Sequence, residues 1–213
     1  YKVIQAGAKV LGNNKDGIDF SLEDDYYGDT RFHIPFIAWY QVMNASLALT
    51  TMEVLKDRIP VTMEQLQAGI ANTRWQGRME TILPGVIVDG AHNEDGVRRF
   101  VETAERFQKE YPLTLLFSAV NDKDYQDMIH TICSRIKFRK VVTTEVGGYR
   151  EVPSAELAEI FCKEGCKDVG NSDNIEEAFH MAHEAKGEDG MLFCVGSLYL
   201  AGELKAYLAK RNG

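Results

Sequence analysis

An aspartate, a histidine and an asparagine stand close together in the stretch VIVDGAHNEDG, where an apolar run ends. Asp89 falls at the carboxyl end of an expected strand, Gly90 allows a tight turn, and Asn93 can cap a following helix. The free N–H groups at such a helix start attract phosphate. Asp89 could accept hydrogen bonds from ribose hydroxyls, and His92 could contact a phosphate or a developing charge. A turn in which Asp89 binds local N–H groups and His92 lies on the surface explains the spacing equally well.

A serine follows another buried apolar run, in the stretch CVGSLYLAG. In a parallel sheet its turn would lie on the same edge as Asp89, so Ser197 could converge with His92. Spacing alone favours the simpler interpretation, in which Ser197 only caps the helix that it begins. The sequence has no G-x-S-x-G motif, so a hydrolase serine is not expected.

Two further polar pairs could bind a ligand. Arg74 and Arg78, in RWQGRME, offer planar forks for phosphate, although a surface ion pair with an acid such as Glu80 is the commoner fate of a lone arginine. Gln41 and Asn44 interrupt an apolar helical stretch and need partners if they are buried. A ligand or a hydrogen bond in the core would serve those two amides equally well.

The four cysteines are too sparse for a secreted disulfide scaffold, and we expect reduced thiols in a cytoplasmic protein. Cys162 and Cys166 lie one helical turn apart, and His180 and His183 are the only other candidates for a shared metal site. We do not expect such a site. The sequence also has neither a G-x-x-x-x-G-K-[ST] phosphate loop nor a G-x-G-x-x-G fingerprint.

From about Gly85 onward, strand-like and helix-like stretches alternate, which predicts an α/β fold with a mostly parallel sheet and helices on both faces. We expect strands near residues 86–89, 114–120, 140–145 and 191–195 to be neighbours in this Rossmann-like sheet. Asp89, Ser118 and Ser197 should then lie along one edge. Ser154 and Asp173 are the expected N-caps of two of the helices.

The first part of the chain has a different pattern. The stretches YKVIQAGAKVLG and GIDFSL predict two or three strands joined by NNKDG, and a long apolar helix follows Pro35. Thr62 and Gln65 form an expected capping box. We place a boundary near residues 72–78. It divides residues 1–74, the incomplete end of a larger domain, from a second domain of residues 75–213.

Composition limits the possible partners. The chain has 213 residues and a net charge of −8, which argues against nucleic-acid binding. No apolar run approaches the ~20 residues that a membrane helix needs, and we do not expect a signal peptide. We therefore expect small-molecule partners, with neither nucleic acid nor membrane, and a monomer.

Five segments, in order along the chain, resemble motifs of the folylpolyglutamate synthase and dihydrofolate synthase family of the Mur ligase superfamily. They are FIAWYQVMNASLAL, NTRWQGRME, VIVDGAHNEDG, NDKDY and VGSLYLAG. Two positions depart from the family pattern: Glu94 replaces its usual proline, and Ala38 stands where glycine is frequent. Neither of these two positions corresponds to an expected ligand contact.

The resemblance implies an ATP-dependent ligase that adds L-glutamate to folate or dihydropteroate through an acyl phosphate. By position, Asn44 would serve the adenine of ATP, Arg78 its phosphates and Asp89 its ribose. His92 and Ser197 would lie near the incoming glutamate and the reacting carboxylate.

In that family an ATPase domain carries the phosphate loop, the Mg²⁺ ligands and a carbamylated lysine. The resemblance places these groups before Tyr1, so we expect these 213 residues alone to be inactive. Two alternatives stay open: a stand-alone binding domain for a nucleotide or an amino acid, and a muramyl-type ligase for another amino acid.

Overall fold

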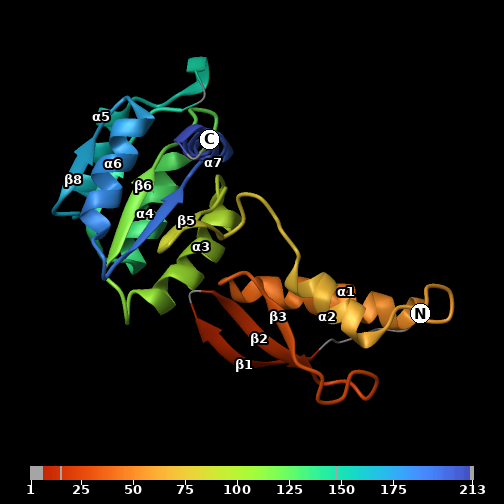
Figure 1. Ribbon diagram of the computed structural model, residues 1–213. Coiled ribbons are helices and arrows are strands. Elements are labelled where there is room, and N and C mark those ends of the chain that lie inside the picture. The colour runs from red at the N-terminus through yellow and green to blue at the C-terminus, as the bar shows by residue number, and fades with distance from the viewer. Residues whose placement is uncertain (1–6, 15, 147, 212–213) are drawn as a thin grey trace. The chain divides into compact units, whose positions relative to one another are not determined.

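The computed structural model describes residues 7–14, 16–146 and 148–211. Its contacts divide the chain into two compact units, Tyr1–Trp75 and Gln76–Gly213 (Figure 1). Among the described residues, no helix is both long and apolar enough to cross a membrane.

The first unit is a small antiparallel sheet with two helices. Its strands pair in the order β1 (Ala8–Asn14), β2 (Gly17–Leu22) and β3 (Phe32–Ile34). The helices are α1 (Trp39–Leu55) and α2 (Met63–Ala71). The two expected strands are therefore present, with β3 as a third. The part of the first expected strand in residues 1–6, and Lys15 of the connecting turn, lie outside the described residues.

Alternating side chains of β2 and β3 form the core of this unit together with α1. Phe20 and Phe32 are fully buried and pack ring to ring, and Leu49 of α1 belongs to the same cluster. The expected capping box of α2 is confirmed, because the side chain of Thr62 accepts the N–H of Gln65 while the Gln65 side chain accepts the N–H of Thr62.

The second unit is a six-stranded sheet with helices on both faces (Figure 1). The strands pair in the order β4-β5-β9-β6-β7-β8. Only β4 is antiparallel to its neighbour, so the prediction of a mostly parallel sheet is confirmed. The strands are β4 (Glu80–Leu83), β5 (Val86–Val88), β6 (Leu113–Phe117), β7 (Phe138–Thr143), β8 (Val169–Asn171) and β9 (Met191–Val195).

The helices of this unit form two layers. Helices α3, α4 and α5 pack side by side on one face, and α6 and α7 cover the other. The sheet is buried on both sides: Phe193 of β9 packs on Phe100 of α3, whereas the preceding Leu192 joins the cluster beneath α6 and α7. The bounds are α3 (Glu94–Phe107), α4 (Tyr125–Arg135), α5 (Ser154–Lys163), α6 (Ile175–Lys186) and α7 (Leu198–Arg211), with a 3₁₀ turn at Gly148–Arg150.

Two of the expected helix caps are wrong. Pro153 is the N-cap of α5, so Ser154 is already helical, and its hydroxyl donates to Asp173 Oδ1. This bond engages Asp173, and Asn174 caps α6 instead by accepting two backbone N–H groups. The edge strands β4 and β8 were not expected from the sequence.

Candidate active site

The carboxyl ends of the parallel strands bring three of the expected residues to one edge of the sheet. Asp89 follows β5, Ser197 follows β9 after a single glycine, and Ser118 follows β6. Since β9 pairs with both β5 and β6, the three turns are neighbours in that order. The expected shared edge is therefore confirmed, and it is the edge at which α/β sheets bind ligands.

Asp89 is an almost completely buried carboxylate, with 3% of its surface exposed. Its Oδ2 accepts the N–H of Met79 at 2.9 Å, and its Oδ1 accepts the N–H of Ala91 at 2.8 Å. Burial raises the pKa of Asp89 to about 6, although the two N–H groups and the nearby charges of Arg78 and His92 oppose this shift. The carboxylate thus accepts hydrogen bonds from local backbone N–H groups, as one interpretation of the sequence predicted.

The turn at Asp89 and Gly90 forms hydrogen bonds with the backbone on both sides of Arg78. The N–H of Gly90 donates to the carbonyl of Gly77 at 2.7 Å, and the N–H of Met79 donates to Asp89. Met79 has a φ of 46°, an unfavourable conformation for a side chain of this size, so these bonds hold a strained segment in place. Arg78 therefore projects from a backbone whose position β5 determines.

A second contact fixes the same segment from α7. Glu80 accepts the N–H of Gly77 at 2.7 Å through one carboxylate oxygen, and the other accepts the ammonium of Lys205 at 2.7 Å. No described group forms a hydrogen bond with the Arg78 guanidinium, which is half-buried. It is thus a positioned cation beside a buried carboxylate, and it is available to bind an anion.

His92 is oriented by its own turn. Its Nδ1 lies 2.7 Å from the carbonyl of Gly90, and because a carbonyl only accepts, Nδ1 carries the proton. In the neutral ring, Nε2 is then left as an acceptor. Asn93 caps α3 as expected, with its side-chain oxygen accepting the N–H of Gly96 at 2.9 Å.

Ser197 is 2% exposed and accepts the N–H of Tyr199 at 3.1 Å, so it caps α7 as the simpler interpretation foresaw. The turns of Ser197 and His92 are close because Leu198 packs onto Gly90, where a Cβ would lie only 2.2 Å from Leu198 Cδ2. Within the described residues no hydrogen bond joins the serine to the histidine.

Two buried hydroxyls near the same edge have no hydrogen-bond partner within the described structure. They belong to Ser118, just after β6, and Thr144, just after β7, and both residues are fully buried. Buried hydroxyls are normally paired, and these two lie at the edge where α/β sheets bind ligands. Thr144 was missed by the sequence reasoning, although its position directly after a strand could have identified it.

The remaining candidates lie in the first unit. Asn44 is exposed on α1, and its side-chain N–H donates to the side-chain oxygen of the buried Gln41 at 2.8 Å. Arg74 forms no ion pair with Glu80. It donates instead to backbone carbonyls of Ala71 and Thr73 after the end of α2.

No group of three or more potential metal ligands occurs among the histidine, cysteine, aspartate and glutamate residues that the structure describes. His180 contacts the hydroxyl of Tyr207, and Cys166 lies against Cys133.

Comparison with known proteins gives a consistent result. The family model for the Mur ligase, glutamate ligase domain matches residues 77–198. The dihydrofolate synthase/folylpolyglutamate synthase of Bacillus subtilis is 29% identical over 197 residues, which are 89% of this chain and 43% of that protein. The chain therefore spans less than half the length of this curated relative.

Two solved structures have the same fold. Escherichia coli FolC in complex with DHPP and ADP has a TM-score of 0.77 at 17% identity, over 99% of this chain and 47% of that chain. Folylpolyglutamate synthase from Thermotoga maritima has a TM-score of 0.75 at 24% identity, over 95% of this chain and 46% of that chain. At these identities the likeness is one of fold.

The family match covers more than half of the chain and includes Arg78, Asp89, His92 and Ser197. The chain belongs to the Mur ligase family with the glutamate ligase domain, and it is similar to folylpolyglutamate and dihydrofolate synthases over nearly its whole length.

Proposed function

We propose that this chain is the C-terminal part of an ATP-dependent ligase that joins L-glutamate to folate or dihydropteroate. The glutamate ligase domain, the folate-pathway relatives and the fold of FolC support this proposal. The rest of the ligase would supply the phosphate loop and the Mg²⁺ ligands, because these 213 residues contain no phosphate-loop motif. On their own they would then be inactive.

The proposed reaction has two steps. A folate carboxylate oxygen attacks the γ-phosphorus of ATP, so an acyl phosphate forms and ADP leaves. The amine of glutamate then attacks the acyl carbon, so an amide forms and inorganic phosphate leaves with the bonding electron pair. Charge accumulates on the transferring phosphoryl group in the first step, and a positioned cation lowers that barrier most effectively.

Arg78 is the residue that we assign to this charge. Its guanidinium is free of described hydrogen bonds, while the backbone on both sides of it is held by the turn after β5. A fixed backbone lowers the cost of ordering the side chain around a phosphate. The observation that supports the proposal most strongly is this guanidinium, which lacks described hydrogen bonds and projects from a backbone held in place.

Asp89 would act in two ways. Its hydrogen bond to Met79 makes it a positioning residue for Arg78. Each carboxylate oxygen can also accept one more hydrogen bond, so Asp89 is proposed to meet the ribose of ATP when the nucleotide is bound.

We propose separate roles for His92, Ser197 and Asn44. His92, with Nδ1 held by Gly90, would present Nε2 to the incoming glutamate or the reacting carboxylate. Ser197 would use its hydroxyl proton there, since its oxygen already accepts the N–H of Tyr199. Asn44 keeps its side-chain oxygen for the adenine end of ATP.

The test uses the longer ligase that contains this chain. Arg78→Ala should mainly lower kcat, by roughly a hundredfold, because the lost interaction strengthens as charge develops. Asp89→Asn should raise the KM for ATP more than it lowers kcat, because a ribose contact acts in the ground state as well. Steady-state kinetics with ATP varied at saturating folate and glutamate would measure both effects.

Arg98→Ala is the matched control, since this exposed arginine of α3 pairs only locally with Asp95 and should leave the kinetics unchanged. If Arg78→Ala changed only the KM for ATP, the charge-stabilising role would be wrong. If neither pterin substrate supported glutamate addition by the unaltered enzyme, the proposed function itself would fail.

A further inference from the structure

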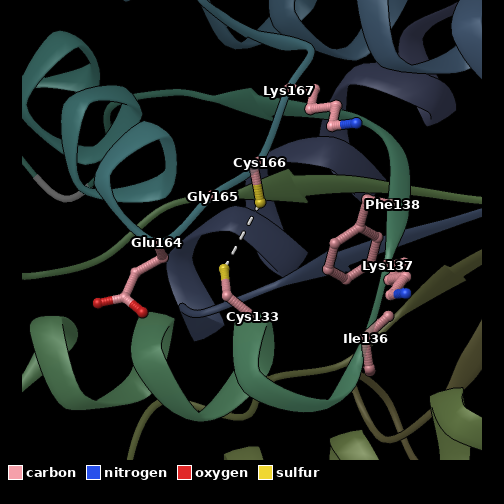
Figure 2. Close-up of a pocket in the computed structure, with 8 residues that line it drawn as sticks. All are labelled: Cys133, Ile136, Lys137, Phe138, Glu164, Gly165, Cys166 and Lys167. Atoms are coloured by element: carbon pink, nitrogen blue, oxygen red, sulfur yellow. Dashed lines mark hydrogen bonds between the residues drawn. The ribbon is translucent and has the colours of Figure 1, made fainter.

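A cavity of about 480 Å³ lies at the opposite edge of the parallel sheet from the candidate active site. Its walls are the end of α4, the turn into the amino end of β7, and the turn between α5 and β8 (Figure 2). Asp89, Ser118 and Ser197 follow the carboxyl ends of parallel strands, whereas this cavity borders the amino ends of β7 and β8. Nothing in the proposed ligase reaction uses it.

Two cysteines face each other in the wall of this cavity. Figure 2 shows the thiols of Cys133, from α4, and Cys166, from the turn after α5, pointing toward one another. Their Sγ atoms lie 3.6 Å apart, and both residues are partly accessible. The two positions are 33 residues apart in the sequence, so only the fold brings them together.

The facing Cys133 thiol favours reaction at Cys166. Lys137 and Lys167 line the same cavity. A hydrogen bond from the Cys133 thiol lowers the pKa of Cys166, while burial and Glu164 act in the opposite direction. One oxygen of Glu164 lies 2.9 Å from Nδ1 of His130. The hydrogen bond with Cys166, together with burial, raises the pKa of the Cys133 thiol.

A metal site is a weaker explanation for this pair. Structural zinc sites need four ligands, and no set of three or more potential ligands occurs among the described residues. A facing thiol pair beside a cavity is the arrangement of a thiolate that attacks and a second thiol that resolves.

We propose that Cys133 and Cys166 form a redox-active dithiol site, in which Cys166 reacts with a small-molecule disulfide in the cavity and Cys133 resolves the product. The Cys166 thiolate attacks one sulfur of the small disulfide, so a mixed disulfide forms and one small thiolate leaves. Cys133 gives its proton to that thiolate and attacks Cys166 Sγ, so the bond between Cys166 and the small molecule breaks. The second small thiolate leaves and takes up the proton that Cys166 released when it ionised. The protein dithiol is oxidised by two electrons, and the small disulfide is reduced to two thiols.

Oxidation would join α4 covalently to the turn before β8. The link closes a loop of about 33 residues, which restricts the unfolded chain, and we expect Tm to rise by roughly 5–10 °C. Asp89, Ser118 and Ser197 are not part of this loop. The inference is therefore independent of the proposed ligase function.

The experiment uses the full chain with Cys162→Ser, which removes the exposed thiol, while Cys194 is fully buried and should stay unreactive. The protein is incubated with glutathione disulfide and measured by intact mass and non-reducing peptide mapping. We expect the loss of two hydrogen atoms and a peptide that links Cys133 to Cys166. Added Cys133→Ser should trap one glutathione on Cys166, and added Cys166→Ser should slow the reaction at least about tenfold.

The proposal would be overturned if the Cys162→Ser protein gave no Cys133–Cys166 peptide under conditions in which glutathione disulfide modifies the exposed Cys162 of the unaltered chain. A Cys166→Ser protein that reacted as fast as the parent would also contradict it. The peptide map of the parent needs no substitution at either thiol, so it decides the question even if a serine variant fails to fold.

Discussion

At the scale of single residues, the buried carboxylate of Asp89 has opposing effects on stability. Removing it from water raises its pKa to about 6, which makes the ionised form costly in the folded chain. Its two backbone hydrogen bonds offset part of that cost and hold Met79 in a conformation with positive φ. Asp89 thus stabilises the local geometry around Arg78 at the expense of global stability near neutral pH.

The pH dependence follows from the direction of that shift. Because the pKa of about 6 in the folded chain exceeds the ordinary 3.8, the folded state binds more protons between these values. The contribution of Asp89 protonation to the free energy of unfolding is complete below about pH 3.8, and it is lost as pH rises through about 6. The loss is on the order of 3 kcal/mol.

Asp89→Asn should remove this dependence. Asparagine has one acceptor oxygen, so one N–H of the pair from Met79 and Ala91 loses its partner, and the variant should be less stable than the parent at pH 4 by about 1–3 kcal/mol. This difference in the free energy of unfolding should shrink by pH 7, because only the unaltered chain loses stability as the pH rises. Hydrogen exchange of amides in β5 and β9 measures unfolding of this unit, and a stability difference that did not change with pH would show that Asp89 does not titrate as stated.

The sequence predicted the position of Asp89 at a strand end but not its main partner. The contact with Met79 depends on the antiparallel return from β4 to β5, and β4 itself was not expected. The turn at His92 and the cap at Asn93 are local, so spacing alone could predict them. The local contacts of His92 and Asn93 were thus readable, whereas the contact of Asp89 with Met79 was not.

At the scale of elements, Gly196 determines how closely β9 and β6 approach at the candidate site. Its φ is 109°, and a Cβ there would lie 2.1 Å from the backbone carbonyl of Ser118. Backbone cannot move aside as a flexible side chain can, so glycine is required where the two strands end. Gly90 differs, because a Cβ there would first meet the partly exposed side chain of Leu198.

Three alanine substitutions should therefore differ in their effects. Gly196→Ala should destabilise the chain by more than about 3 kcal/mol, through both strain and overlap. Gly90→Ala should cost less, since Leu198 can change rotamer. Gly202→Ala in α7 has open space and should be neutral or stabilise by up to about 1 kcal/mol. Urea unfolding of the three variants measures the order, and equal costs at Gly196 and Gly202 would contradict this account.

The central strands β5 and β9 were predictable because each is a fully apolar and buried run, VIV and MLFCV. The edge strands β4 and β8 were not, since they have four and three residues and are only partly buried. The N-caps at Ser154 and Asp173 failed for a related reason. A hydrogen bond between Ser154, the first residue of α5, and Asp173, just before α6, replaces the caps that each could have formed locally.

At the scale of the whole molecule, α1 has an apolar stripe that the described residues leave accessible. Met43, Leu47 and Val54 are 49%, 67% and 57% exposed, and their spacing puts them on one side of the helix. The opposite side packs into the core of the first unit through Val42, Ala45 and Leu49. A helix that is apolar on both sides is typical of a buried position, which supports the proposal that residues 1–74 end a larger domain.

Substitution of Leu47 tests that proposal in two proteins. In the 213-residue chain, Leu47→Lys should change the free energy of unfolding by less than about 0.5 kcal/mol, because the side chain is exposed. In the longer ligase the same lysine would replace a buried leucine, with an expected cost of about 2 kcal/mol or more. Leu49→Ala is the control, since Leu49 is 1% exposed and its loss should cost about 2–5 kcal/mol in both proteins. Denaturant unfolding of both proteins gives the comparison. An equally small effect of Leu47→Lys in the longer ligase would mean that the stripe faces solvent there too, and that the first unit is not the end of a larger packed domain.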